Sequence, residues 1–101
     1  MAELPGPMQE LLVALGHPMR RDLLRLTSNQ PRITVRSASR QLRESQSNVR
    51  YHMTSLSQSG LVEPVDRKTV KGSTARFWSS TERGEGAIAF LDEIEMREGR
   101  Q

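Results

Sequence analysis

The sequence predicts a mainly α-helical domain with a small β-hairpin, in the order α-α-β-α-α-β-β-α. Apolar residues repeat at helical spacing over the first 60 residues, short runs rich in β-branched and aromatic residues follow, and a helical repeat then returns. The chain has 101 residues, of which 35% are hydrophobic and 27% are charged, as expected of one folded domain. We expect this domain over residues 7–98, with flexible tails at residues 1–6 and 99–101.

Three helices and a short strand are predicted in the first 42 residues. Gly16 ends the first helix, and Pro18 begins the second, because the first helical turn leaves an amide proton without a partner and proline lacks one. A short strand is expected at Arg32 and Ile33, after which Thr34 caps the third helix. The apolar positions of the three helices are Met8, Leu11, Leu12 and Leu15, then Met19, Leu23, Leu24 and Leu26, then Val35, Ala38 and Leu42.

A fourth helix, over residues 45–59, has two unlike faces. Ser45 is a good N-cap, because its hydroxyl can satisfy an amide of the first turn. Val49, Met53 and Leu56 recur at i, i+4 and i+7, so they share a face that must be buried. The opposite face carries Gln46, Ser47, Arg50, Tyr51 and Thr54. Amide, hydroxyl and guanidinium groups on one exposed helix face are what the reading of base edges in the DNA major groove requires.

The remaining residues predict a hairpin and a last helix. Residues 61–67 and 74–79 are expected to form strands, joined by a loop over residues 68–73 that contains Gly72. Pro64 cannot donate to a strand ladder, so we expect its strand at the sheet edge. Thr81 caps a last helix with an apolar stripe, and Phe90 lies beside that stripe. The stripe consists of Ile88, Leu91 and Ile94.

The charges form a basic middle between acidic ends. Residues 17–79 contain twelve Lys or Arg and four Asp or Glu, a net charge of +8, whereas residues 1–16 carry −2 and residues 80–101 carry −3. This distribution is expected if the middle of the chain faces phosphate and the ends face something else. The alternative is a solvated surface that happens to be rich in arginine.

Several classes of protein are disfavoured by what the sequence lacks. The chain has no cysteine, and therefore no disulfide, thiolate metal site or cysteine nucleophile. It shows no long apolar run and no signal-peptide pattern at residues 1–7, so we expect a cytoplasmic protein, near the nucleoid if the source is bacterial. No Ser-His-Asp spacing, glycine-rich phosphate loop or metal motif is visible, so we expect neither an enzyme nor a cofactor.

Four short motifs resemble, in the right order, those of ArsR-type (arsenical-resistance repressor) winged helix-turn-helix regulators. Residues 15–24 resemble the family's LxHPxRxxIL junction between the first two helices. Residues 45–53 are similar to its recognition-helix signature SQSxVSxHL, and residues 59–62 to its AGLV helix exit. Residues 75–82 resemble its second wing strand, xxYYxLTxE. The resemblance covers roughly residues 8–95, nearly the whole chain.

The resemblance implies a homodimeric repressor that binds a double-stranded DNA operator. It implies base reading from the start of the recognition helix, at Gln46, Ser47, Arg50 and Tyr51. It implies phosphate contacts from Arg36, Arg40, Arg43, Thr54, Lys68, Lys71 and Arg76. The first and last helices of the family pack across a two-fold axis, and the matching residues here are Met8, Leu11, Leu12, Leu15, Ile88, Leu91 and Ile94. The alternative is that these two stripes only close the core of one protomer.

The chain departs from the family pattern at three places. The family usually has glycine and an aliphatic residue where this chain has Arg43 and Glu44, so Arg43 is expected in a left-handed conformation at a cost of about 1 kcal/mol. Arg50 and Tyr51 stand where serine and histidine are common, so the operator should differ. Ser80 replaces a leucine, which predicts a less well anchored wing strand.

Metal sensing in this family uses cysteine pairs or clusters of His, Asp and Glu. Here we interpret His17 as a helix-junction residue that bonds the backbone, and His52 as a semi-buried histidine with its hydrogen bonds satisfied. A site built from Asp92, Glu95 or Glu98 is the alternative, but acids on a solvated helix face are ordinary. We therefore expect no metal dependence.

One competing function remains after these exclusions. Winged helices also serve as docking modules, so the basic face can instead bind an acidic protein or RNA without recognising duplex DNA. The sequence does not identify an operator or an effector.

Overall fold

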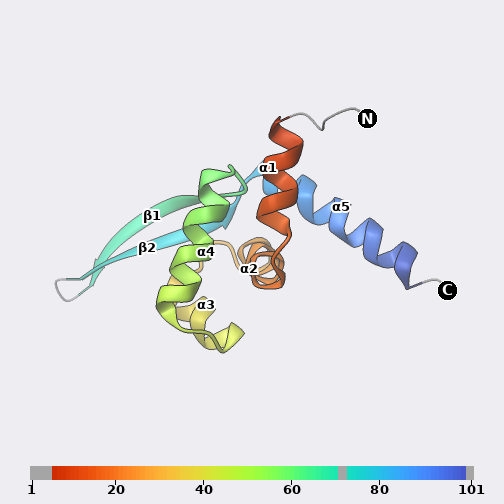
Figure 1. Ribbon diagram of the computed structural model, residues 1–101. Helices are drawn as coiled ribbons and strands as arrows, with labels where there is room; N and C mark the ends of the chain where they lie inside the picture. The colour runs from red at the N-terminus through yellow and green to blue at the C-terminus, as the bar shows by residue number, and fades with distance from the viewer. Residues whose placement is uncertain (1–5, 71–72, 100–101) are drawn as a thin grey trace.

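The computed structural model describes residues 6–70 and 73–99, with the backbone alone for residues 6–8, 10, 66–70 and 73–75. Its helices are α1 (Gly6–Leu15), α2 (Pro18–Asn29), α3 (Val35–Leu42), α4 (Gln46–Gln58) and α5 (Glu82–Glu98), and its strands are β1 (Val62–Val70) and β2 (Ser73–Ser80). The predicted fold class is confirmed. Figure 1 shows that the hairpin and α5 extend from opposite sides of the core that contains α2, α3 and α4.

The tails expected at both ends can be compared with these bounds only in part. α1 begins at Gly6, one residue before the expected start of the domain. Gly99 is the C-cap of α5. The rest of both tails, residues 1–5 and 100–101, lies outside the described residues.

Side-chain caps begin four of the helices where the sequence predicts them. His17 caps α2, because its Nδ1 accepts a hydrogen bond of 3.1 Å from the amide of Met19. This contact confirms the interpretation of His17 as a junction residue that bonds the backbone. Three hydroxyl caps accept hydrogen bonds of 3.0–3.1 Å from the amide three residues further on, namely Thr34 before α3, Ser45 before α4 and Thr81 before α5.

The turn between α3 and α4 has the backbone conformation that the sequence predicts. Arg43 has φ 56° and ψ 46°, which places it in the left-handed region. The Glu44 amide donates to the Ser39 carbonyl at 3.1 Å, and the Ser39 hydroxyl donates to the Glu44 carbonyl. These bonds hold the turn tight. They offset the cost of about 1 kcal/mol expected for a residue with a side chain in this conformation.

The hairpin is longer than predicted. The strands run to Val70 and from Ser73, so residues 68–70 and 73 belong to strands where the sequence analysis expected a loop. Thr69 pairs with Thr74, and β-branched residues of this kind favour extended backbone, which explains the longer ladder. Lys71 and Gly72 lie outside the described residues.

β1 is the edge strand, as Pro64 predicts. β1 and β2 are antiparallel, and their register shifts between Pro64 and Asp66. On the other side of β2, Ile33 forms an isolated antiparallel bridge with Trp78. The Trp78 amide donates to the Ile33 carbonyl at 2.8 Å, and the Ile33 amide donates back at 3.1 Å. The short strand expected at residues 32–33 is therefore this single bridge, which leaves β2 between β1 and Ile33.

The hydrophobic core draws on every helix and on the base of the hairpin. Val49, Met53 and Leu56 of α4 are fully buried, as their spacing predicts. Ala38 of α3 is also fully buried, and Val35 and Leu42 pack half-buried beside it. The other buried hydrophobic residues are Ala14, Leu15, Leu23, Leu24, Ile33, Leu61, Val62, Trp78 and Ala87.

α5 begins tightly against the corner where α4 leads into β1. The Thr81 hydroxyl donates to the Gly60 carbonyl at 2.6 Å, and the Thr81 amide donates to the Leu61 carbonyl at 3.0 Å. A Cβ atom on Gly84 would lie 2.1 Å from the Leu61 carbonyl oxygen. Only glycine therefore allows this approach between α5 and the chain leaving α4.

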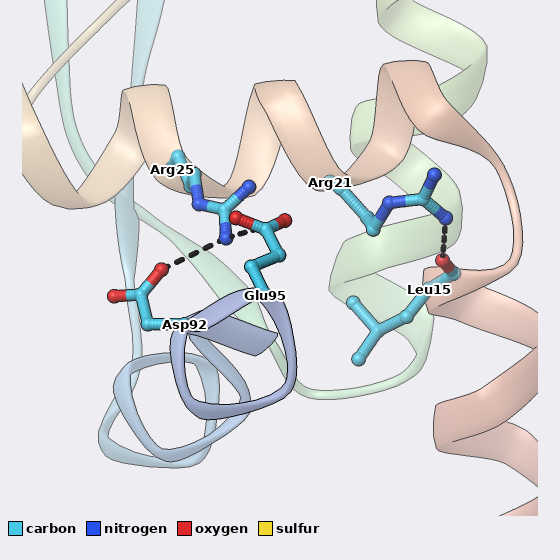
Figure 2. A network of polar contacts seen from close by, with 5 residues as sticks. All are labelled: Leu15, Arg21, Arg25, Asp92 and Glu95. Atoms are coloured by element: carbon cyan, nitrogen blue, oxygen red, sulfur yellow. Dashed lines mark hydrogen bonds and ion pairs between the residues drawn. The ribbon is translucent and has the colours of Figure 1, made fainter. Parts of the chain in front are cut away.

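Two arginines of α2 connect it to the helices at both ends of the chain. Arg25 donates to Asp92 at 2.8 Å and lies 3.1 Å from Glu95, both on α5 (Figure 2). The hydrogen bond to Asp92 is the main cause that raises the pKa of Arg25. Arg21 donates to the Leu15 carbonyl, at the end of α1, over 2.6 Å. α2 thus contacts α1 and α5 through polar groups as well as through the core.

Ser80 joins its strand to a carboxylate of α5, and the expectation that the strand is less well anchored than with leucine stays a prediction. Its Oγ donates to Glu85 Oε1 at 2.5 Å, and Ser28 Oγ of α2 lies 2.8 Å from the same oxygen. These bonds lower the pKa of Glu85, that from Ser80 being the larger cause. The carboxylate joins β2, α2 and α5, a connection that leucine would not make.

His52 is a buried polar residue between α2 and α4. It is only 4% exposed, and its Nδ1 accepts a hydrogen bond of 3.1 Å from Arg20 Nε. The interpretation of His52 as a satisfied histidine is confirmed. Burial, followed by the charges of His17 and Arg20, holds the pKa of His52 below its usual 6.5. The folded state therefore favours the neutral ring.

We predict that Gly84→Ala lowers the free energy of unfolding by about 1–3 kcal/mol, because its methyl group must push the Leu61 carbonyl away. Gly86→Ala is the matched control, since a Cβ there meets nothing within 4 Å. That substitution is expected to stabilise the helix by about 0.5–1 kcal/mol. Urea unfolding curves of both variants measure the difference. Equal stability of the two variants would contradict the tight approach.

We also predict that stability falls as the pH drops below about 6.5. Because the folded state has the lower His52 pKa, the unfolded chain takes up this proton first, and acid favours unfolding. The stabilisation is present above pH 6.5 and is lost as the pH falls through the lowered pKa. Urea unfolding at pH 7.5 and at successively lower pH values measures the slope, and His52→Gln should flatten it. An unchanged slope in His52→Gln would refute this origin.

Candidate nucleic-acid interface

The predicted reading face of α4 is open to solvent. Gln46, Ser47, Arg50 and Thr54 are exposed, and Tyr51 is 63% exposed. The opposite side of the same helix is fully buried in the core. α4 is thus fixed by its apolar face and offers a row of hydrogen-bonding side chains on the other, the arrangement that entry into a major groove requires.

Arginines flank this face on the preceding helix and on the hairpin. Arg36 and Arg40 of α3, and Arg43 of the turn, are all exposed. Arg76 of β2 is exposed too, and its guanidinium carbon lies 5.7 Å from the centroid of the Trp78 ring. Of the predicted wing lysines, Lys68 is described only by its backbone in β1, and Lys71 lies outside the described residues.

The electrostatics of α3, the turn and α4 favour an anion. Between residues 35 and 58 the chain has four arginines and a single acid, Glu44. Glu44 accepts a hydrogen bond of 3.3 Å from Asn48 Nδ2, so its carboxylate lies at the N-terminal end of α4. A negative charge at this end interacts favourably with the helix dipole. The four arginines outnumber this single acid and are therefore the dominant charges of the surface.

A side-chain cluster that the sequence analysis did not find adjoins the reading face. The guanidinium carbon of Arg20 lies 5.9 Å from the centroid of the Tyr51 ring, and the Tyr51 and His52 rings meet edge to face at 5.2 Å. The His17 and His52 rings are 4.5 Å apart. Arg20 and His17 belong to the junction motif that resembles HPxR, which was the only available signal. The spacing within this motif does not reveal that Arg20 contacts His52, which lies 32 residues further along the chain.

The structure divides the predicted dimer residues into two groups. Leu15 is buried in the core, and Leu11, Ile88 and Leu91 pack against it half-buried. Leu12 and Ile94 are 47% and 37% exposed. For Met8 only the backbone is described. Exposed apolar residues that the sequence analysis did not assign to a dimer face are Val13 on α1 and Phe90 and Met96 on α5.

The acids of α5 are held by an arginine. Asp92 and Glu95, offered above as an alternative metal site, both contact Arg25 (Figure 2). Among the side chains that the structure describes, no group of three or more His, Cys, Asp or Glu is placed to hold a metal ion. No helix in residues 6–70 and 73–99 is long and apolar enough to cross a membrane.

Comparisons with known proteins agree with this geometry. The model of a family described as a helix-turn-helix domain matches residues 15–65, just over half of the chain. No curated protein matches the chain.

Solved structures share the whole arrangement. A homodimeric winged helix-turn-helix DNA-binding domain from Mycobacterium bovis, described as a possible ArsR-family transcriptional regulator, has a TM-score of 0.75 at 16% identity, over 94% of this chain and 90% of that one. Reduced HlyU from Vibrio cholerae has a TM-score of 0.70 at 25% identity, over 87% of each chain. A possible transcriptional regulator for arsenical resistance has a TM-score of 0.64 at 25% identity, over 84% of this chain and 82% of that one.

The family match spans the end of α1, the junction that caps α2, the turn at Arg43 and the whole of α4, which are the parts that form and support the exposed face. The solved structures add the hairpin and α5. The chain belongs to the helix-turn-helix domain family, and it shares the winged fold of structures that are described as possible ArsR-family or arsenical-resistance regulators.

Proposed function

We propose that this protein is a DNA-binding transcription regulator that acts as a dimeric repressor. The observation that carries the proposal is the exposure of Gln46, Ser47, Arg50 and Tyr51 on α4, together with the exposed arginines of α3 and β2. The helix-turn-helix match and the transcriptional regulators among the similar structures support this proposal.

The side chains of α4 have the chemistry to distinguish bases. Arg50 can bind O6 and N7 of guanine with two hydrogen bonds, and Gln46 can do the same with N6 and N7 of adenine. Each such pair contributes about 1–3 kcal/mol of discrimination against the wrong base. Arg36, Arg40 and Arg43 would bind phosphates on one flank, and Arg76 on the other. Phosphate contacts fix the position of α4 on the duplex, and base contacts read the sequence.

A dimer would present two copies of α4 to one face of the DNA. The exposed apolar residues of α1 and α5 lie on the helices that match the dimer helices of the family, and α5 extends away from the hairpin (Figure 1). Two recognition helices about 34–36 Å apart fit successive major grooves. A dimer bound to its operator in this way would repress transcription, because it would exclude RNA polymerase.

Binding to a duplex of the protein's own upstream region, compared with a random duplex over a salt series, tests the proposal. We expect specific binding that weakens steeply with salt, because phosphate contacts release counterions. Arg50→Ala should reduce the preference for the specific duplex by about 1–3 kcal/mol and leave random binding nearly unchanged. Equal and weak binding of wild type to all duplexes would instead favour a docking module for an acidic protein or RNA.

The dimer has a separate test on α5. Ile94→Glu places a charge on the apolar stripe of α5, one helical turn after the exposed Phe90, so we expect monomers by light scattering and loss of the two-fold footprint. Met96→Glu is the matched control, because Met96 is 62% exposed but points about 200° away around the helix. It should leave the dimer intact. A dimer that survives Ile94→Glu would show that this face of α5 is not the interface.

A further inference from the structure

We propose that Arg20 is a positioning residue for base recognition, which holds the Tyr51 ring in place on the reading face of α4 before DNA binds. The inference rests on the proposed function, since it takes Tyr51 as a base-reading residue. Arg20 belongs to α2, outside the reading helix, and is not among the residues expected to contact DNA.

Tyr51 needs such support because the protein surrounds it so little. Its side chain is 63% exposed, so the core does not restrict its rotamer. A side chain that must be ordered when the complex forms reduces affinity and blurs the distinction between bases, whereas one already held in its bound orientation does not. Tyr51 is one of the residues expected to read a base, and it therefore gains from a fixed partner within the protein.

Arg20 and His52 both contact the Tyr51 ring. The guanidinium carbon of Arg20 lies 5.9 Å from the ring centroid, within the range of a cation–π interaction. His52 meets the same ring edge to face at 5.2 Å. An offset or edge-to-face arrangement is the favoured geometry for two aromatic rings. Together the two contacts restrict the rotation of Tyr51 about its χ angles.

Arg20 is itself held by contacts from two other helices. Its Nε donates to His52 Nδ1 at 3.1 Å, and one terminal nitrogen lies 3.5 Å from the Val13 carbonyl on α1. The His17 and His52 rings also pack together, with their centroids 4.5 Å apart. Arg20 is half-buried, and its guanidinium group bonds within the protein, which fits support of a neighbour better than binding of a phosphate.

Lysine cannot replace this arginine. A lysine at position 20 would keep the positive charge, but it has no planar fork to donate from Nε and cover a ring at the same time. Arg20→Lys therefore distinguishes a phosphate contact from the support of the Tyr51 ring. A phosphate contact would largely survive the change, whereas the support of Tyr51 would be lost.

The test uses the full-length protein and a duplex selected from a random library, together with each of its single-base variants. Tyr51→Ala defines the base pairs that Tyr51 reads, where we expect discrimination to fall about tenfold. Arg20→Lys and Arg20→Gln should lower discrimination at the same base pairs. They should leave affinity for random duplex and its salt slope close to wild type. Adding Arg20→Gln to Tyr51→Ala should produce no further loss.

Arg36→Gln is the matched control, since Arg36 is an exposed arginine of α3. It should weaken all duplexes alike and reduce the salt slope by about one. The chain contains one tyrosine, so its ring NMR signals need no separation from others. In the free protein these signals should move in Arg20→Lys and stay in Arg36→Gln, which checks the contact in a folded variant.

Two results would overturn the inference. The first is that Arg20→Gln weakens all duplexes equally with a lower salt slope while Arg20→Lys behaves as wild type, because Arg20 would then be a phosphate contact. The second is that Tyr51→Ala changes no base preference. Specific operator binding that persists in that variant would still support the proposed function, so the two failures are distinguishable.

Discussion

The burial of α2 at the centre of the domain is the constraint on which the rest of the structure depends. Leu23 and Leu24 are fully buried, and Thr27 beside them turns its hydroxyl back to the Leu24 carbonyl at 2.6 Å. α2 contacts α1, α3, α4, α5 and β2. Every element that the proposed function uses therefore takes its position from this helix. Its two ends are defined locally, by the His17 cap and by the bond from the Gln30 amide to the Leu26 carbonyl.

Around that apolar face, α2 reaches three other helices through arginines. Arg20 contacts α4, Arg21 contacts the end of α1, and Arg25 contacts α5 (Figure 2). These arginines account for three of the twelve bases in the basic middle of the chain. The net charge of that segment consequently overstates the charge available to phosphate. The exposed arginines of α3 and β2 are the more accurate measure of the charge on the predicted phosphate-binding surface.

The features that could be predicted from the sequence are those that depend on neighbouring residues. Caps at Ser45 and Thr81, and the left-handed Arg43, depend on residues within a few positions along the chain, and all are confirmed. Contacts between segments far apart in the chain could not be predicted in this way. Nothing near Arg20 indicates that its guanidinium meets a histidine 32 residues later.

The apolar stripes of α1 and α5 illustrate a second limit of the sequence. Helical spacing shows which residues share a face, but not how far neighbouring elements cover that face. Leu15 and Ile94 occupy equivalent places in the predicted stripes, yet one is buried in the core and the other is partly exposed. That difference depends on where α2 and the hairpin lie, which spacing does not encode.

The corner at Thr81 has a mechanical consequence. Through its hydroxyl and amide, this residue joins the exit of α4 to the entry of α5, and Gly84 lets the backbones touch there. These contacts fix the end of α4 against the start of α5. In a dimer that meets along α5, a small change in the angle between the protomers would therefore produce a larger displacement of α4. In the proposed dimer, this corner would couple the way the two protomers meet to the distance between their two copies of α4.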